Sequence, residues 1–177
     1  MPLLKDGKTV NDPWVHVADE VAIPSTGAVI VGLKRWRLER ESLLKRGHPV
    51  GVRLKSNHTA GDVADDLEHL GVVALAFPVF TDGRAYTNAR RLRERYNYRG
   101  EVRAIGNVLP DQYLFMQRCG FDAFEIRDSE NEEAWDKATG VISVFYQPAA
   151  DGKRPWCRCA TLIREIKTNK RARREKF

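Results

Sequence analysis

The sequence predicts an α/β fold: a single domain with a largely parallel sheet of five to six strands, flanked by helices. Apolar runs typical of strands buried on both faces recur along the 177 residues. A segment with helical spacing of its apolar residues follows each of the first five runs. Such successive βα units form parallel sheets with the helices packed outside. The expected strands span residues 28–33, 50–54, 72–77, 102–105, 121–126 and 141–146.

Two shapes of this sheet stay open at the level of sequence, an open sheet and a half-barrel. A complete eight-unit barrel needs about 250 residues, which excludes it for this chain.

The first 27 residues are expected to form an extension that begins with a β-hairpin. An Asp-Gly turn stands between short apolar runs in residues 3–10, the pattern of a tight hairpin. Residues 14–17 alternate and predict a further strand. Gly27 marks the boundary with the α/β domain, which is expected over residues 28–166.

The expected helices follow the strands in order. The first covers residues 34–46, and the second begins at a cap supplied by Thr59 or Asp62. Two more cover residues 109–118 and 129–139, the latter with Ser129 and Glu132 as a capping box. The helix after residues 72–77 has one apolar face, made of Ala85, Ala89, Leu92 and Tyr96.

Charge and composition describe an ordinary globular chain with a basic end. Five of its six net positive charges belong to residues 167–177, which are expected to be a disordered tail. No apolar run reaches the roughly 20 residues of a membrane span, and no secretory signal starts the chain. A cytoplasmic location is therefore expected, with no membrane partner, and nucleic-acid binding is disfavoured because the remaining chain is nearly neutral.

The polar turn after residues 72–77 is the main candidate for a binding site. Ligands of parallel sheets lie beyond the carboxyl ends of the strands. A glycine and free amides at a helix start favour an anion, which Arg84 could clamp. Alternatively, Asp82 caps the helix and leaves Arg84 on the surface. The candidate anion-binding residues are Thr81, Asp82, Gly83, Arg84, Asn107 and Gln112.

Catalytic and docking residues are less sharply indicated. His58 follows a strand and is a candidate acid or base, as is Asp82, although a loop histidine is more often structural. Arg91 and Arg95 share a stripe with Arg84 that could dock an acidic partner or remain a solvated face.

Several motifs are missing from the sequence. It contains no Gly-x-Gly-x-x-Gly, no Gly-x-x-x-x-Gly-Lys and no Gly-x-Ser-x-Gly pattern. Cys157 and Cys159 form a Cys-x-Cys pair without the second pair that structural zinc requires, so packing is the expected role of both thiols. We therefore expect neither a cofactor nor a metal.

Four segments carry a resemblance to a known proteobacterial family, domain of unknown function 934. They read Phe-Thr-Asp-Gly-Arg-Ala from Phe80, Ala-Arg-Arg-Leu-Arg from Ala89, Gly-Glu-Val-Arg-Ala from Gly100 and Arg-Cys-Gly-Phe-Asp-Ala-Phe-Glu from Arg118. The resemblance covers about residues 27–147. Members of that family are often described as probable oxidoreductases involved in sulfite reduction, because their genes tend to lie beside sulfate-assimilation genes. Many carry an aspartate where this chain has Asn107.

The resemblance implies a pathway, and the residues leave the activity open. We expect an accessory protein of assimilatory sulfate or sulfite reduction that acts with sulfite reductase or another enzyme of the pathway. The alternative is a small enzyme or carrier that binds a sulfur oxyanion in the crevice of the sheet. The family description suggests an oxidoreductase, but the sequence has none of the cofactor motifs named above. Whether the protein is an enzyme therefore stays open.

Overall fold

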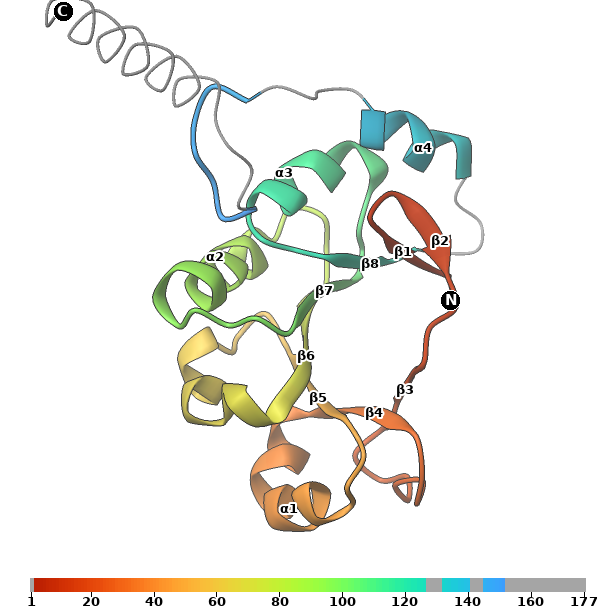
Figure 1. Ribbon diagram of the computed structural model, residues 1–177, viewed down its shortest axis with the longest axis vertical. Helices are drawn as coiled ribbons and strands as arrows, with labels where there is room; N and C mark the ends of the chain where they lie inside the picture. The colour runs from red at the N-terminus through yellow and green to blue at the C-terminus, as the bar shows by residue number, and fades with distance from the viewer. Residues whose placement is uncertain (1, 127–131, 141–144, 152–177) are drawn as a thin grey trace, which may run out of the picture.

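The computed structural model shows one twisted sheet of eight strands with helices packed on one of its faces (Figure 1). It describes residues 2–126, 132–140 and 145–151. The strands are β1 (Leu3–Lys5), β2 (Lys8–Val10), β3 (Trp14–His16), β4 (Ala28–Gly32), β5 (Val50–Leu54), β6 (Leu70–Phe77), β7 (Glu101–Gly106) and β8 (Ala123–Glu125). The helices are α1 (Leu33–Lys45), η1 (Ala60–His69), α2 (Arg84–Arg90), η2 (Arg91–Arg95), η3 (Pro110–Gln112), α3 (Tyr113–Arg118) and α4 (Glu132–Gly140).

The sheet is a half-barrel with the strand order β2-β1-β8-β7-β6-β5-β4-β3. Strands β3 to β8 are parallel, and only β1 runs antiparallel to its neighbours β2 and β8. The predicted α/β fold and largely parallel sheet are confirmed, and of the two shapes left open the half-barrel is the correct one. The predicted strand number was too low, because the N-terminal segment supplies three strands.

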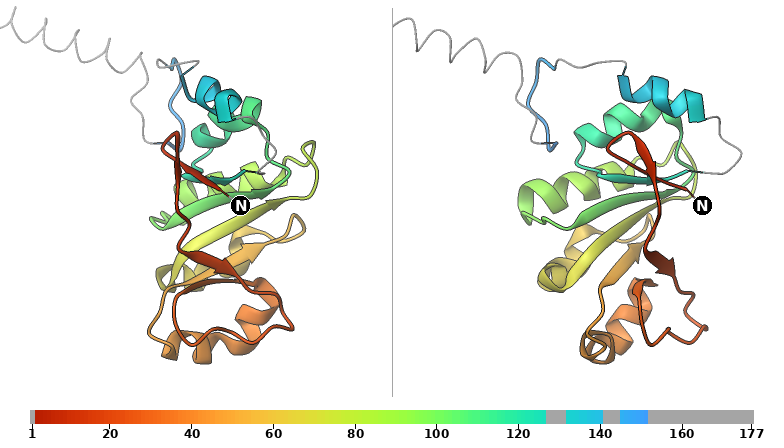
Figure 2. Two further views of the ribbon diagram at one scale, coloured as in Figure 1. Left: turned by 90° about the vertical axis from the view of Figure 1, so that its right-hand side faces the viewer. Right: turned by 45° about the vertical axis from the view of Figure 1, so that its right-hand side comes forward.

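The N-terminal segment is part of the sheet at both of its edges. Its hairpin is confirmed: the turn residues Asp6 and Gly7 both have positive φ angles, of 51° and 74°. Strand β1 pairs with β8, whereas β3 pairs with β4 at the opposite edge. The chain between them crosses the face of the sheet away from the helices (Figure 2). We call this face, on the inside of the curve, the concave face.

Alternation along the strands separates two cores. On β6, Val73, Leu75 and Phe77 face the helices in the main core, where the predicted helix face of Ala85, Ala89 and Leu92 is buried. A smaller cluster lies on the concave face and is made of Ile30, Val72, Ala74 and Ile105, with Trp14 and Ala76 packed against it.

The helices differ from expectation mainly in their geometry. Thr59 and Asp62 form a capping box together, and the helix they start is a 3₁₀ helix, η1. The helix that starts at Arg84 widens into the π turn η2, where the Tyr96 amide bonds the carbonyl of Arg91. The expected helix over 109–118 divides into η3 and α3, with Pro110 in its first turn.

The remaining C-terminal expectations are only partly described. Helix α4 overlaps the expected helix and ends one residue beyond it, but Ser129 of the predicted capping box falls outside the described residues. Four residues of the expected strand 141–146 also fall outside them, and Phe145 and Tyr146 are not in a strand. Cys157, Cys159 and the basic tail lie beyond the described residues as well. Among the described helices, none has the length and apolar character to cross a membrane.

Candidate functional site

The polar turn after β6 is closed by its own aspartate. Asp82 Oδ1 accepts hydrogen bonds from the Arg84 amide (3.2 Å) and from Arg84 Nε (2.9 Å), and Oδ2 accepts one from Nη2 (2.7 Å). These guanidinium and amide contacts hold the pKa of Asp82 well below its ordinary range. The donors expected to bind an anion therefore already bind a carboxylate of the chain.

Arg84 also joins two neighbouring strand ends. Its Nη2 donates to the hydroxyl of Ser56 (3.1 Å), in the turn after β5. The Arg84 side chain stays 62% exposed. An external anion at residues 81–84 would have to displace Asp82, and this geometry favours the capped-helix alternative.

The structure brings one of the two predicted partner residues to this turn. Gln112 Nε2 donates to the carbonyl oxygen of Phe80 (3.2 Å), and its Oε1 is buried without a partner among the described residues. Asn107 instead lies at the end of β7, where its backbone amide bonds the carbonyl of Phe77 (2.8 Å). That bond joins the ends of β6 and β7.

His58 has a structural contact in the turn after β5. Its Nδ1 accepts a hydrogen bond from the Lys55 amide (3.1 Å), and partial burial lowers the pKa of the imidazole. The carbonyl of His58 accepts a bond from Asn88 Nδ2 (2.9 Å). These contacts give His58 a role in closing the turn, whereas its predicted catalytic role stays a prediction.

The arginine stripe on α2 and η2 is interrupted. Arg91 and Arg95 are exposed, as expected of docking residues. Asn88, which lies between them and Arg84 in the stripe, is 5% exposed and bonds the Ala60 amide through Oδ1 (3.0 Å). The exposed arginines therefore form two separate positive positions.

An apolar surface at the carboxyl ends of the strands was not anticipated from the sequence. Val79, Phe80 and Phe115 are 50%, 54% and 59% exposed. The ring of Tyr86 lies 4.9 Å from that of Phe115 between centroids, and Gln112 ties the Phe80 loop to the helical region before Phe115. We call Val79, Phe80, Tyr86 and Phe115 the aromatic patch.

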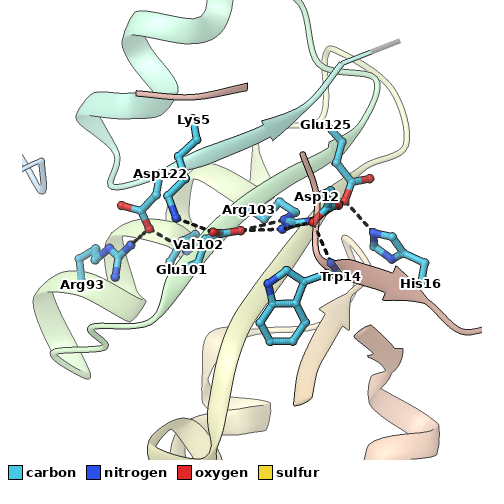
Figure 3. A network of polar contacts seen from close by, with 10 residues as sticks. All are labelled: Lys5, Asp12, Trp14, His16, Arg93, Glu101, Val102, Arg103, Asp122 and Glu125. Atoms are coloured by element: carbon cyan, nitrogen blue, oxygen red, sulfur yellow. Dashed lines mark hydrogen bonds and ion pairs between the residues drawn. The ribbon is translucent and has the colours of Figure 1, made fainter. Parts of the chain in front are cut away.

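A second group of polar residues lies on the concave face around Arg103, which is fully buried (Figure 3). Its guanidinium donates to Asp12 through Nη1 (2.7 Å) and Nη2 (3.1 Å). It also donates to Glu101 through Nε (2.9 Å) and to Glu125 through Nη1 (3.1 Å). Three carboxylates from the crossing chain, β7 and β8 therefore surround one cation.

This network extends from β1, next to one edge of the sheet, to β3 at the other edge. Lys5 on β1 donates to Glu101 (2.9 Å), and His16 on β3 contacts Glu125 (2.6 Å). Burial alone would raise the pKa of Glu125, but the contacts with His16 and Arg103 outweigh it and lower that pKa. Glu125 is therefore held as a carboxylate.

A pocket of about 470 Å³ opens beside this network. It is lined by Pro2, Val10, Asn11, Asp12, Trp14, His16 and Glu125. The sequence carried one signal of the network: Glu101 and Arg103 are charged residues at alternate positions of an otherwise apolar strand. The partners Asp12 and His16 gave none, because they come from the segment that we expected to be a separate extension.

Another cation lies on the concave face without a partner. Arg53 on β5, Ala74 on β6 and Arg103 on β7 are in register, so all three point to the same side of the sheet. The Arg53 side chain has no hydrogen bond or ion pair with any residue that the structure describes. It lies two strands from Arg103, a separation of roughly 10 Å.

The fold and these contacts define a half-barrel α/β protein with a buried ionic network on its concave face. The model of a family described as bacterial protein of unknown function (DUF934) matches residues 51–157, more than half of the chain. The chain belongs to this family. The matched region contains Arg84, Arg103 and Glu125, whereas Asp12 and His16 precede it. No curated protein matches the chain.

Proposed function

We propose that this protein is a cytoplasmic accessory protein of assimilatory sulfate or sulfite reduction, and that it docks on sulfite reductase through the aromatic patch. The observation that carries the docking proposal is the exposure of Val79, Phe80 and Phe115 at the carboxyl ends of the strands. The resemblance to the family supplies the pathway.

The aromatic patch has the composition of an interface. Aromatic residues and arginine are enriched where proteins meet, and contiguous exposed apolar surface marks interaction sites. Arg84 lies a few residues from Phe80 and is 62% exposed, which provides a charged rim. Arg91 and Arg95 add a second, separate positive position on the same helical region.

The patch is also held in place before any partner arrives. The Tyr86 ring packs edge-on against the buried Phe77, with 5.2 Å between the ring centroids. The centroid of the Phe115 ring lies 4.9 Å from that of Tyr86. Gln112 fixes the carbonyl of Phe80. A preorganised surface loses less side-chain freedom on binding, which favours a docking role.

Co-purification with sulfite reductase from a cell that contains both proteins tests this proposal. Phe80→Ser and Phe115→Ser should each weaken the complex by about tenfold or more, because exposed aromatic anchors carry much of the binding energy of an interface. Leu38→Ser is the matched control: Leu38 is 76% exposed, but it lies on α1. Failure of the wild-type proteins to associate at micromolar concentration, or equal loss with Leu38→Ser, would contradict the proposal.

The second candidate is a small enzyme or carrier that binds a sulfur oxyanion in the crevice of the sheet. Arg53 favours it, since an unpaired guanidinium on the concave face can bind an oxyanion through two parallel hydrogen bonds. Calorimetric titration with sulfite tests it, with Arg53→Gln expected to abolish the heat and Arg91→Gln to leave it unchanged. A visible absorbance band in the purified protein would instead indicate a bound redox cofactor.

A further inference from the structure

The pocket beside the concave-face network is distinct from the aromatic patch, and we infer that it binds a small organic cation such as a primary ammonium group. It opens near the carboxyl ends of the parallel strands β3 and β8, the end at which parallel sheets bind ligands. The lining residues include Trp14, His16, Asn11 and two acidic residues, Asp12 and Glu125.

The charges around the pocket do not balance. Three carboxylates, Asp12, Glu101 and Glu125, contact two permanent cations, Arg103 and Lys5. The Arg93–Asp122 pair nearby balances itself. Arg53 is two strands away and does not line the pocket. One negative charge is therefore uncompensated unless a proton on His16 or a bound cation supplies the positive charge.

The geometry locates that charge at Glu125. Glu125 Oε1 contacts His16 Nε2 (2.6 Å) and accepts a hydrogen bond from Arg103 Nη1 (3.1 Å). Glu125 Oε2 accepts no hydrogen bond from the described residues. The side chain is more than nine-tenths buried and lines the pocket. An N–H donor of a cationic ligand in the pocket is the group that this second carboxylate oxygen would bind best, because a charge-assisted hydrogen bond is stronger than a neutral one.

Trp14 adds a second recognition element. Trp14 lines the pocket, and its indole is fixed against the sheet, since a Cβ atom at Gly71 would come within 2.9 Å of its Cη2 atom. A cation over an indole face gains attraction from the ring quadrupole. An anion would instead meet two carboxylates, which excludes a sulfur oxyanion from this pocket.

Three aromatic probes of similar size but different charge test the inference: the cation benzylamine, the neutral benzyl alcohol and the anion benzoate. Each is titrated into the full chain by calorimetry, and the indole N–H signal of Trp14 is followed by NMR. Benzylamine should bind and shift that signal, benzyl alcohol should bind at least about tenfold more weakly, and benzoate should not bind. Equal or tighter binding of benzoate, or no binding of benzylamine at millimolar concentration, would overturn the inference.

Two variants of His16 test the role of Glu125 without removing any partner of Arg103. His16→Lys places a permanent cation beside Glu125 and should weaken benzylamine binding at least about tenfold, because it supplies the missing charge. His16→Gln keeps a neutral donor of similar reach and should retain binding. If the two variants bind benzylamine equally, the charge of Glu125 does not recognise the ligand.

Discussion

His16 and Glu125 meet across the concave face at 2.6 Å, although they belong to β3 and β8, the first and last of the parallel strands. Four strands separate β3 from β8 in the sheet order, so the contact exists only because the sheet curves. The crossing chain places Asp12 in the same network. The curvature of the half-barrel therefore brings residues from distant strands together around the buried Arg103.

Asp12→Ala should destabilise the protein by about 2–4 kcal/mol, because it removes the bidentate partner of a buried guanidinium. Asp12 accepts both Nη1 and Nη2 of Arg103, whose side chain is fully buried. Urea unfolding followed by circular dichroism measures the change. Glu41→Ala is the control, since Glu41 contacts Lys45 only at 3.9 Å and both side chains are more than 80% exposed. It should cost less than about 0.5 kcal/mol, and an equal cost for both variants would contradict a buried network.

Stability should fall on acidification partly through Glu125. The folded state lowers the pKa of this carboxyl below its ordinary 4.5. Its stabilising contribution is therefore complete above the unfolded-state pKa and is lost as the pH falls through the lower folded-state value. Urea unfolding at a series of pH values between about 5 and 3 should give a shallower decline for Glu125→Gln than for the wild type. Identical slopes would show that Glu125 has the same proton affinity in both states.

Gly106→Ala should destabilise the end of β7 by about 2–4 kcal/mol, since two penalties combine there. The residue has a φ of +96°, and a Cβ atom would lie 2.5 Å from the carbonyl oxygen of Phe77. Gly47→Ala separates the two effects: its φ is +66°, but no atom lies within 4 Å of the added Cβ. The thermal midpoint should drop much further for Gly106→Ala, and a similar drop for both would mean that the close approach to Phe77 has no energetic effect.

Local patterns predicted most of the parallel sheet. The strand Leu70–Phe77 and the helix face of Ala85, Ala89 and Leu92 follow from apolar periodicity, which burial alone imposes. The positions of β1 and β3 in the sheet do not follow from apolar periodicity. Both strands are three residues long, and their partners β8 and β4 are chosen by tertiary packing that no local pattern encodes.

The candidate site was predicted less completely than the fold. The rule that ligands lie at strand ends led to the turn at Asp82 and Arg84, yet it could not say that the aspartate would occupy the donors. Arg103 lay inside an expected buried strand, where a charged residue needs partners. Those partners include Asp12, 91 residues earlier in the chain, and such a distant pairing is decided by the path of the crossing chain.

Asp82→Ala should create an anion site at the turn, where the Asp82 carboxylate blocks one in the wild type. The change frees the Arg84 amide and guanidinium, which Asp82 engages through three hydrogen bonds. Sulfate affinity measured by calorimetry should rise at least about tenfold over the wild type, because the anion no longer competes with an internal carboxylate. Asp65→Ala, which removes an exposed carboxylate on η1, should leave the affinity unchanged and controls for net charge. Adding Arg84→Gln to Asp82→Ala should abolish the gain. If sulfate binds wild type and Asp82→Ala equally, the Asp82 carboxylate does not block the turn, and the anion site predicted from the sequence would operate beside it.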